Sequence, residues 1–352
     1  MIRRPPRSTQ GVSSAASDVY KRQVICVTCS EDGGKIAAGD RNGRLTLADR
    51  GGNQTWEKEV DEGIHGLAIL GNGNKVVCGG KDCKLRMFNS LGNVEWEQTI
   101  GKSIWSISVD PDGQFIVVGT GDSISLYTES GLQLWEHITN RAMVGVSISK
   151  NGSLVAGCGD EFLYSLDGDG GLLWEKQRSD SLWDVSVGND GEKIFVGGWD
   201  CNVQCLDKHG NDSWNFTTGG YVRAVVPLHN GGILAGSHDG NMYHLSSSGE
   251  LLEKFEAEGE VTCVGTSKQM NLAVAGIAVG TVMLPELSKH VKNNNIQEVN
   301  NLQNRALELC LFLSIPAATA LVLASEEITT SLFGYGCLLY TSPSPRAGLL
   351  SR

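Results

Sequence analysis

MVGVSISKNGSLVAGCGDEFLYSLDGDGGLLWE, residues 143–175, contains four short apolar runs separated by turn-forming residues. The first run ends at Asn151-Gly152, and the second ends at Asp160. The third ends at an Asp-Gly-Asp-Gly turn that starts at Asp167, and the fourth opens with Leu-Leu-Trp. Short apolar runs joined by tight turns are typical of strands linked as hairpins. We therefore predict one four-stranded antiparallel sheet in this stretch.

The same module recurs along the chain with a nearly constant period. A glycine precedes a tryptophan by four residues in five copies: Gly52–Trp56, Gly92–Trp96, Gly131–Trp135, Gly170–Trp174 and Gly210–Trp214. A sixth copy keeps Gly249 but has Glu253 in place of tryptophan, and successive glycines lie 39 or 40 residues apart. Ten residues before the glycine stands a polar turn former: Asn42, Asp82, Asp160, Asp200 and Asp239, with Asp122 one residue out of step. Such a period, filled with strands and turns, predicts the blades of a β-propeller.

Each module also begins with a similar strand. Seven candidates for the innermost strand of a blade begin at Val24, Ile64, Ile104, Met143, Leu182, Val222 and Val261. Small and β-branched residues dominate these strands, as crowding near a propeller axis requires. We therefore predict an all-β fold, a seven-bladed β-propeller of four-stranded antiparallel blades, over residues 24–292.

The last module is incomplete in the sequence. Strands are predicted at Val261–Thr266, Leu272–Ala278 and Gly280–Leu287, but no Gly-x-x-x-Trp strand follows them. Propellers commonly close with a strand from one terminus that completes the blade begun at the other terminus. We expect that closing strand just before Val24, where an unrelated tail stands instead.

The repeat resembles WD-repeat and quinoprotein-like (PQQ-like) propeller repeats over about residues 24–287. The resemblance is closer to the second kind, because the tryptophan follows an Asp-x-x-Gly turn, as in Asp167 to Trp174 and Asp207 to Trp214. The Gly-His and Trp-Asp pairs of typical WD repeats are absent. The resemblance implies the propeller fold. It does not carry over a quinone cofactor, because the adjacent cysteines that hold that cofactor in the family have no counterpart here.

The two ends of the chain differ from the repeats. Residues 1–23 and 337–352 resemble translated sequencing-adapter sequence; the alternative is a disordered tail at each end. The first tail carries a net charge of +4 and the second +2, so the chain's net charge of −11 becomes −17 for residues 24–336. A body this acidic repels phosphate backbones, and we predict no nucleic-acid partner.

Residues 293–336 form a segment of different composition. Ile296, Val299, Leu302 and Ala306 follow helical spacing, and sixteen residues without a charge run from Leu309 to Ala324. A membrane span usually needs about 20 apolar residues, and a buried helix about 10–14. The sequence therefore predicts either a truncated membrane anchor through 307–324 or a helix that packs on the propeller or opens a further domain.

The cysteines and histidines form no recognisable metal site or disulfide framework. Cys26 and Cys29 share a predicted strand with opposite orientations, while Cys78 and Cys158 lie in second-strand apolar runs. Unpaired buried thiols indicate a reducing compartment, and we predict a cytoplasmic protein, with membrane anchoring through the C-terminal helix as the alternative. The histidines, among them His229, His238 and His244, are predicted in surface turns and not at a shared metal site.

One repeated position indicates a binding site. The second residue of each inner strand is expected at the face where the inner strands begin, which we call the channel-mouth face. Across the seven modules this residue is Ile25, His65, Trp105, Val144, Trp183, Arg223 and Thr262. Aromatic and arginine side chains around a concavity are good binding anchors. The candidate binding residues are His65, Trp105, Trp183, Arg223 and, from the neighbouring turn, Trp199. The alternative is that Trp105 and Trp183 cap the core between blades.

These features together predict a non-catalytic binding or scaffold module that presents the channel-mouth face to a protein segment or a small ligand. No catalytic residue, metal ligand or cofactor is assigned, because no nucleophile elbow, phosphate loop or zinc-binding motif is present. Two alternatives remain: a fragment of a quinoprotein-like (PQQ-dependent) oxidoreductase, and an extracytoplasmic assembly factor.

Overall fold

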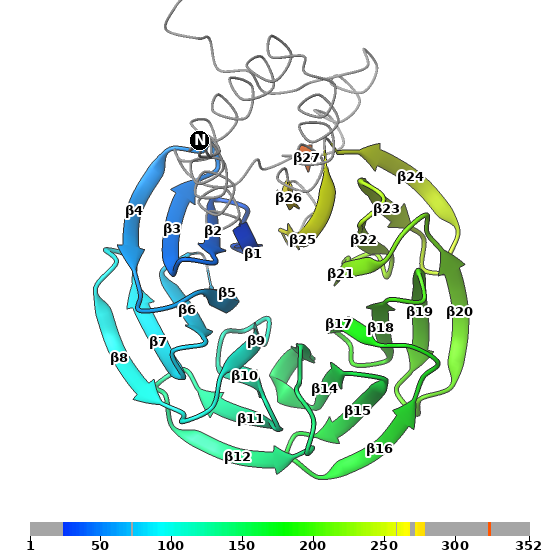
Figure 1. Cartoon of the computed structure of the whole chain (residues 1–352), viewed down its shortest axis with the longest axis horizontal. Helices are drawn as coiled ribbons and strands as arrows, with labels where there is room; N and C mark the ends of the chain where they lie inside the picture. The colour runs from blue at the N-terminus through cyan, green and yellow to red at the C-terminus, as the bar shows by residue number, and fades with distance from the viewer. Residues whose placement is uncertain (1–23, 72, 258, 268–271, 279–322, 325–352) are drawn as a thin grey trace, which may run out of the picture.

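The computed structural model describes residues 24–71, 73–257, 259–267, 272–278 and 323–324, which form an all-β propeller (Figure 1). Blade 1 consists of β1 (Val24–Cys29), β2 (Lys35–Asp40), β3 (Arg44–Asp49) and β4 (Gln54–Glu59). Blade 2 consists of β5 (Ile64–Leu70), β6 (Lys75–Gly80), β7 (Lys84–Asn89) and β8 (Val94–Thr99). Blade 3 consists of β9 (Ile104–Val109), β10 (Phe115–Thr120), β11 (Ser123–Thr128) and β12 (Gln133–Ile138). Blade 4 consists of β13 (Gly145–Ile148), β14 (Leu154–Gly159), β15 (Phe162–Asp167) and β16 (Leu172–Gln177). Blade 5 consists of β17 (Leu182–Val187), β18 (Lys193–Gly198), β19 (Asn202–Asp207) and β20 (Asp212–Thr217). Blade 6 consists of β21 (Val222–Pro227), β22 (Ile233–Ser237), β23 (Asn241–Leu245) and β24 (Leu251–Glu256).

The propeller has six four-stranded blades among the described residues, not the predicted seven. Between blades 6 and 1 lies a smaller sheet of β25 (Glu260–Thr266), β26 (Leu272–Ala278) and the two-residue β27 (Leu323–Ala324). Its inner strand contacts β21 on one side and β1 on the other. The prediction counted inner strands, and a seventh inner strand is present, but the described part of the chain builds only this smaller sheet on it. The predicted strand Gly280–Leu287 lies outside the described residues.

The predicted helical segment 293–336 also lies outside the described residues, except at Leu323–Ala324. There the structure has a strand and not a helix, because the two residues pair with Ala273 and Leu272 on the outer edge of β26. An unpaired strand edge favours the addition of any extended segment. Within the described ranges, no helix has the length and apolar character needed to cross a membrane. The tails 1–23 and 337–352 lie outside these ranges as well.

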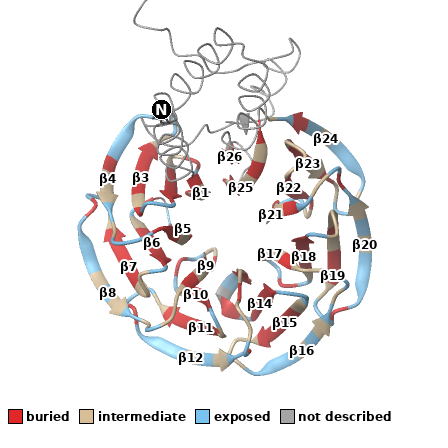
Figure 2. Cartoon of the chain, viewed as in Figure 1, coloured by how far each residue is buried: buried red, intermediate tan, exposed pale blue. Residues whose placement is uncertain are grey.

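Burial is greatest in the second and third strands of the blades and lowest in the outer strands (Figure 2). The second strands are almost fully buried, whereas β8, β12, β16 and β20 alternate between exposed and half-buried residues. The core lies between neighbouring blades: Leu45 and Leu47 of β3 pack with Ile64 and Leu67 of β5 in one cluster. A single blade therefore cannot bury its apolar faces alone and needs a neighbour on each side.

The repeated glycine and tryptophan meet across each blade boundary. The tryptophan of one blade packs on the turn glycine of the next, in the pairs Trp56–Gly92, Trp96–Gly131, Trp135–Gly170, Trp174–Gly210 and Trp214–Gly249. All five glycines have positive φ, which favours glycine. Four of the indoles also donate Nε1–H to a carbonyl of that turn: Trp96 to Glu129, Trp135 to Gly168, Trp174 to Lys208 and Trp214 to Ser247, over 2.8–3.0 Å. We call each of the five tryptophan–glycine contacts a tryptophan latch, whether or not the indole also donates a hydrogen bond.

The turns between second and third strands contain a testable source of strain. Gly43 and Gly240 have φ of 88° and 79° there, but the equivalent residues Cys83 and Cys201 have φ of 61° and 60°. A side chain in this left-handed region costs about 1–2 kcal/mol. We expect Cys83→Gly to raise the free energy of unfolding by about 0.5–1 kcal/mol. This gain is smaller than the strain that is relieved, because glycine adds conformational entropy to the unfolded chain. Urea denaturation measures the change. Cys83→Ala is the control and should bring no gain; a glycine variant no more stable than the alanine variant would contradict the interpretation.

Candidate ligand-binding face

In six inner strands a β-bulge lies at the second residue, the position from which the candidate binding residues were predicted. The register between the first and second strands shifts so that one residue has no partner: Ile25, His65, Trp105, Trp183, Arg223 and Thr262. A bulge bends its strand and redirects the extra side chain, and bulges are frequent beside functional sites. Blade 4 has no such shift, because β13 begins at Gly145, two residues later than predicted, and Val144 precedes it. The candidate residues therefore share a backbone feature that the sequence did not reveal.

A second repeated position lies next to the bulges. The residue that follows each second strand, eleven positions before the turn glycine, is Arg41, Lys81, Trp199 and His238 in blades 1, 2, 5 and 6. The backbone N–H of Trp199 donates to the carbonyl of Ser181 at 2.9 Å, and that of His238 to the carbonyl of Tyr221 at 2.9 Å. Ser181 and Tyr221 immediately precede the inner strands, so these bonds hold the turn beside the bulge. The two positions together form the channel-mouth face.

Aromatic rings stack on this face between blades 5 and 6. The ring centroids of Trp183 and Trp199 lie 6.1 Å apart with an interplanar angle of 8°. Tyr221 continues the stack, 5.1 Å from Trp199 with an angle of 19°, and His238 lies tilted against Tyr221 at 6.0 Å. Trp199 is 44% exposed and Tyr221 43% exposed. The stack is thus a row of nearly parallel rings open to solvent.

Arg223 adds a cation to the aromatic stack. Its guanidinium carbon lies 3.6 Å from the ring centroid of Trp183, a cation–π contact. Burial lowers the pKa of Arg223, while the nearby charges of Asp184 and Glu260 raise it. Arg223 Nε and Trp183 Nε1 are both buried N–H donors without a hydrogen-bond partner among the described residues. Buried donors are nearly always satisfied, so two unpartnered donors on contacting side chains call for an acceptor.

A second group lies on blades 2 and 3. His65 packs edge-on against Trp105 with ring centroids 4.9 Å apart, and Lys81 Nζ lies 5.8 Å from the Trp105 ring. Burial, together with the positive charges of Lys81, Arg41 and Arg223, lowers the pKa of His65 to about 4. The imidazole is therefore neutral at pH 7.

The five predicted residues thus fall into two groups on one face, Trp183, Trp199 and Arg223 in one and His65 and Trp105 in the other. That they bind a ligand stays a prediction. The prediction missed Arg41, Lys81, Tyr221, His238 and Glu260. Glu260 begins β25, and its carboxylate lies 3.7 Å from Nδ1 of His238. Arg41, Lys81 and His238 could have been found from the repeat, because each stands one residue before an aligned turn former.

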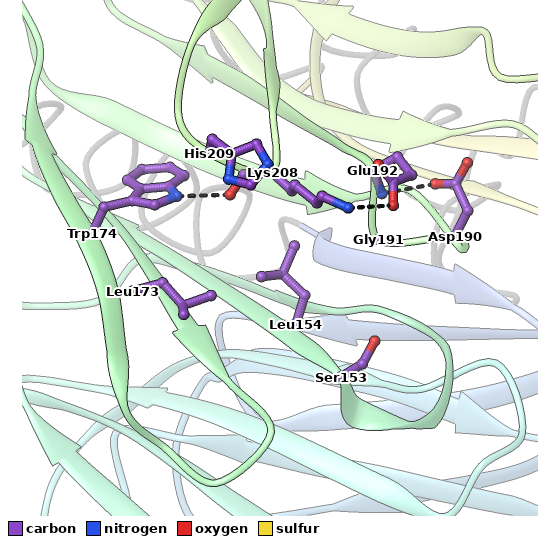
Figure 3. A pocket seen from close by; sticks show the side chains of 9 residues that line it. All are labelled: Ser153, Leu154, Leu173, Trp174, Asp190, Gly191, Glu192, Lys208 and His209. Carbon is purple, nitrogen blue, oxygen red and sulfur yellow. Dashed lines mark hydrogen bonds and ion pairs between the residues drawn. The ribbon is translucent and has the colours of Figure 1, made fainter.

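A groove of about 520 Å³ lies on the other side, among turns of blades 4 and 5 (Figure 3). Its lining residues are Ser153, Leu154, Leu173, Trp174, Asp190, Gly191, Glu192, Lys208 and His209. Lys208 Nζ pairs with Glu192 at 2.9 Å, and the Trp174 indole donates to the carbonyl of Lys208 at 2.8 Å. Lys208, Glu192 and Trp174 of this groove are therefore engaged with one another, in contrast to the unpartnered donors of the channel-mouth face.

The described cysteines form no disulfide. Cys78 and Cys158 are fully buried, as predicted. Burial raises the pKa of the Cys78 thiol to about 12 and raises that of Cys158 strongly as well. These thiols are protonated at neutral pH and are poor nucleophiles. The predicted reducing compartment stays a prediction.

Comparison with known families supports the propeller. Residues 97–127 match the WD domain, G-beta repeat, and residues 154–261 match the lambda-carrageenase beta-propeller domain. The second match spans blades 5 and 6 with Trp183, Trp199, Tyr221 and Arg223. These findings support a propeller of WD-type repeats. The closer resemblance to quinoprotein repeats and the adapter origin of the tails are not confirmed by them.

The end of the chain is similar to a different family. Residues 267–339 match the lipid II flippase MurJ family, starting inside the predicted propeller domain 24–292. The probable lipid II flippase MurJ of Rhizobium meliloti (strain 1021) is 52% identical over 68 residues, and that of Rhizobium tropici is 48% identical over 68 residues. A third relative, from Buchnera aphidicola, is 43% identical over 67 residues. Each alignment covers 19% of this chain and 13% of the relative's length.

Proposed function

We propose that the propeller is a non-catalytic binding module that captures its ligand on the channel-mouth face. The observation that carries the proposal is the pair of buried, unpartnered donors, Trp183 Nε1 and Arg223 Nε, within an exposed aromatic stack. An aromatic surface with a few converging polar groups is the usual composition of a ligand site. The competing interpretation, that Trp183 only caps the core, does not account for the two unpartnered donors.

The repeat supports a rigid, shaped site. The candidate residues lie at bulges of inner strands rather than on long loops, and the turns of blades 5 and 6 are held by a backbone hydrogen bond to the residue that precedes the inner strand. Sites built on strands keep their geometry and lose little conformational entropy when a ligand binds. The blades are therefore the scaffold, and the side chains at two positions per blade supply the recognition.

The test uses an array that carries oligosaccharides, peptides and oligonucleotides. We expect the intact chain to bind at least one of these classes and the Trp105→Ala/Arg223→Ala double variant to lose that binding, with its melting temperature kept within about 3 °C. Lys208→Ala is the matched control, since it removes a cation from the opposite groove and should leave binding unchanged. Binding that survives the double variant, or unfolding of that variant, would contradict the proposal and favour a structural role for the ring.

A second candidate function concerns the end of the chain. We propose that residues 267–339 belong to a membrane component of the lipid II flippase kind; the identity of 52% to a probable lipid II flippase supports this. It agrees with the alternative of membrane anchoring and not with a cytoplasmic location. We expect the full chain to pellet with membranes and to resist extraction at high pH, and Leu313→Arg to weaken that association. A full chain recovered in the soluble fraction would refute the candidate.

A further inference from the structure

We infer that the groove between blades 4 and 5 binds the lysine side chain of a basic peptide (Figure 3). This is a second site, on the side opposite the channel-mouth face, and it shares no residue with that face. The molecule already places a lysine of its own in the equivalent space of other blades. At this boundary Leu154 stands in place of that lysine.

The first residue of the second strand decides whether the space between two blades is filled. In blades 1 to 5 this residue is Lys35, Lys75, Phe115, Leu154 and Lys193. The stem of Lys35 packs on Gly73, a turn glycine of the following blade. The ring of Phe115 packs on the equivalent glycine, Gly152. The side chain of Leu154 is shorter than those of lysine and phenylalanine, and at its boundary the groove of about 520 Å³ remains.

The lysines of blades 2 and 5 show where an ammonium group binds in this space. Lys75 Nζ lies 2.8 Å from a carboxylate oxygen of Glu95 in its own blade and 2.9 Å from one of Glu129 in the next blade. Lys193 Nζ donates to the carbonyl of Ser247 over 2.9 Å. Glu129 and Ser247 occupy the same repeat position, two residues before the glycine of a tryptophan latch. Each lysine therefore crosses the blade boundary and ends at the turn of the next latch.

The groove between blades 4 and 5 keeps the acceptor of this arrangement. The Ser247 carbonyl of blade 6 accepts both Trp214 Nε1 at 3.0 Å and Lys193 Nζ at 2.9 Å. The equivalent carbonyl in the groove is that of Lys208, which accepts Trp174 Nε1 at 2.8 Å and no second donor among the described residues. A carbonyl oxygen has two lone pairs, so this one can also accept the ammonium of a partner.

An apolar wall in the groove fits the stem of a lysine. Leu154, Leu173 and Trp174 line it, and Leu173 is 52% exposed. At the repeat position of Leu173, blade 2 has Glu95, so the groove offers an apolar surface where the boundary of blades 2 and 3 has a carboxylate. Lysine side chains bury their methylene groups along apolar surface and keep the ammonium at a polar end.

The charges in the groove favour a cation. Asp190 and Glu192 lie at the end away from Trp174 (Figure 3). Glu192 pairs with Lys208 Nζ at 2.9 Å. Asp190 Oδ1 accepts the backbone N–H of Glu192 at 3.0 Å, and Oδ2 has no partner among the described residues. Two carboxylates therefore face one ammonium, and an incoming lysine balances the remaining negative charge. The net charge of −11 also attracts basic segments to the chain.

The test measures binding of the full chain to fluorescent peptides of the sequence Gly-Ser-Gly-X-Gly-Ser-Gly with blocked ends. X is lysine, arginine, norleucine or ε-acetyl-lysine, and fluorescence anisotropy gives the affinity. Norleucine keeps the methylene stem without the ammonium, and ε-acetyl-lysine removes the charge. We expect the lysine peptide to bind, and both uncharged peptides to bind at least about 10-fold more weakly. The arginine peptide should bind at least about 3-fold more weakly, because a guanidinium is planar and wider than an ammonium.

Variants of the chain locate the site. Leu154→Lys places an internal lysine in the groove, as in blades 2 and 5. We expect this variant to bind the lysine peptide at least about 10-fold more weakly and to keep the melting temperature of the wild type. Asp190→Asn should weaken binding about 3-fold or more. The matched control is Asp112→Asn, which removes a carboxylate from the equivalent turn of blade 3 and should leave the affinity unchanged.

Each outcome supports or overturns the site. Equal affinity for the lysine and norleucine peptides would show an apolar pocket, and equal affinity for the arginine peptide would show general attraction of positive charge; either result overturns the inference. So would a lysine peptide that fails to bind, or one that Leu154→Lys still binds fully. The Trp105→Ala/Arg223→Ala variant should keep the affinity, which separates this site from the channel-mouth face. A ligand lost on Leu154→Lys is assigned to the groove and is not counted in the test of that face.

Discussion

Trp135→Ala is expected to lower the free energy of unfolding by about 3 kcal/mol. The indole packs on the turn glycine of blade 4, where a Cβ atom at Gly170 would lie 2.7 Å from Cδ2 of the ring. Its Nε1–H also donates to the carbonyl of Gly168 at 2.9 Å. Truncation removes the contact between blades 3 and 4 and the hydrogen bond together. Urea denaturation followed by circular dichroism measures the loss.

A double-mutant cycle with Gly170→Ala isolates the latch. Gly170 has φ of 84°, so alanine there meets both backbone strain and the Trp135 ring. Gly52→Ala is the matched control, since Gly52 has φ of 80° and no atom within 4 Å of a Cβ. We expect about 1 kcal/mol for Gly52→Ala and about 2 kcal/mol more for Gly170→Ala. The excess should vanish when Trp135 is already alanine. Equal losses at the two glycines would show that the latch contributes no steric contact.

The latches also predict that the propeller is weakest at one blade boundary. Five of them join blades 1 to 6 in series. The series has no partner at either end, because Gly52 of blade 1 receives no indole and Glu253 occupies the tryptophan position of blade 6. The smaller sheet of β25, β26 and β27 stands in this gap. Closure there depends on the packing of β25 and β26 against blades 1 and 6 without a tryptophan latch, so local opening should begin at this boundary.

The period and strand positions could be predicted because they follow from local geometry. The turn glycines have positive φ, a conformation that other residues adopt at a cost, so the sequence marks each turn. The number of blades could not be predicted in the same way. Seven inner strands were recognised correctly, but a blade also needs an outer strand. The motif that marks the outer strand, with its glycine and tryptophan, is missing after β26 within residues 24–287.

Only part of the candidate site could be predicted from the sequence. The second residue of each inner strand stood out because Trp105, Trp183 and Arg223 are unusual beside a packed axis. The neighbouring residue of the turn was overlooked, although Arg41, Lys81 and His238 share one repeat position with Trp199. Tyr221 offered no such signal, since the residues that share its repeat position are mixed: Gln23, Gly63, Ser103, Ala142, Ser181 and Glu260. The stacking angles and the unpartnered donors are properties of the folded arrangement, and no spacing in the sequence encodes them.

Asp184→Ala is the second change with a large expected effect, and the effect depends on pH. The carboxylate accepts the backbone N–H of Val225 in the next blade at 2.8 Å and that of Val185 at 2.9 Å. Alanine leaves both donors without an acceptor, which we expect to cost about 3 kcal/mol at pH 5.5. Burial raises the pKa of Asp184 to about 7, against the opposing influence of the two N–H groups and Arg223.

The direction of the pH dependence follows from that raised pKa. Between pH 4 and 7 the folded protein holds a proton on Asp184 that the unfolded chain releases, so the stability of the wild type falls as pH rises through this range. The alanine variant lacks this dependence. Its deficit should therefore shrink by about 2 kcal/mol between pH 5.5 and 8.5, in parallel urea titrations of both proteins.

Ser106→Ala is the control for Asp184, because Ser106 occupies the same position of blade 3 and its Oγ accepts the backbone N–H of Val146 at 3.2 Å. It offers the same link between blades without a titratable group. The control should lose about 1–2 kcal/mol equally at both pH values. The titratable neighbours of Asp184 are Arg223 and Cys158, and both are retained in all variants. If the Asp184→Ala deficit instead grew with pH, the ionised carboxylate would be the stabilising form, and burial would not dominate the electrostatics beneath the binding face.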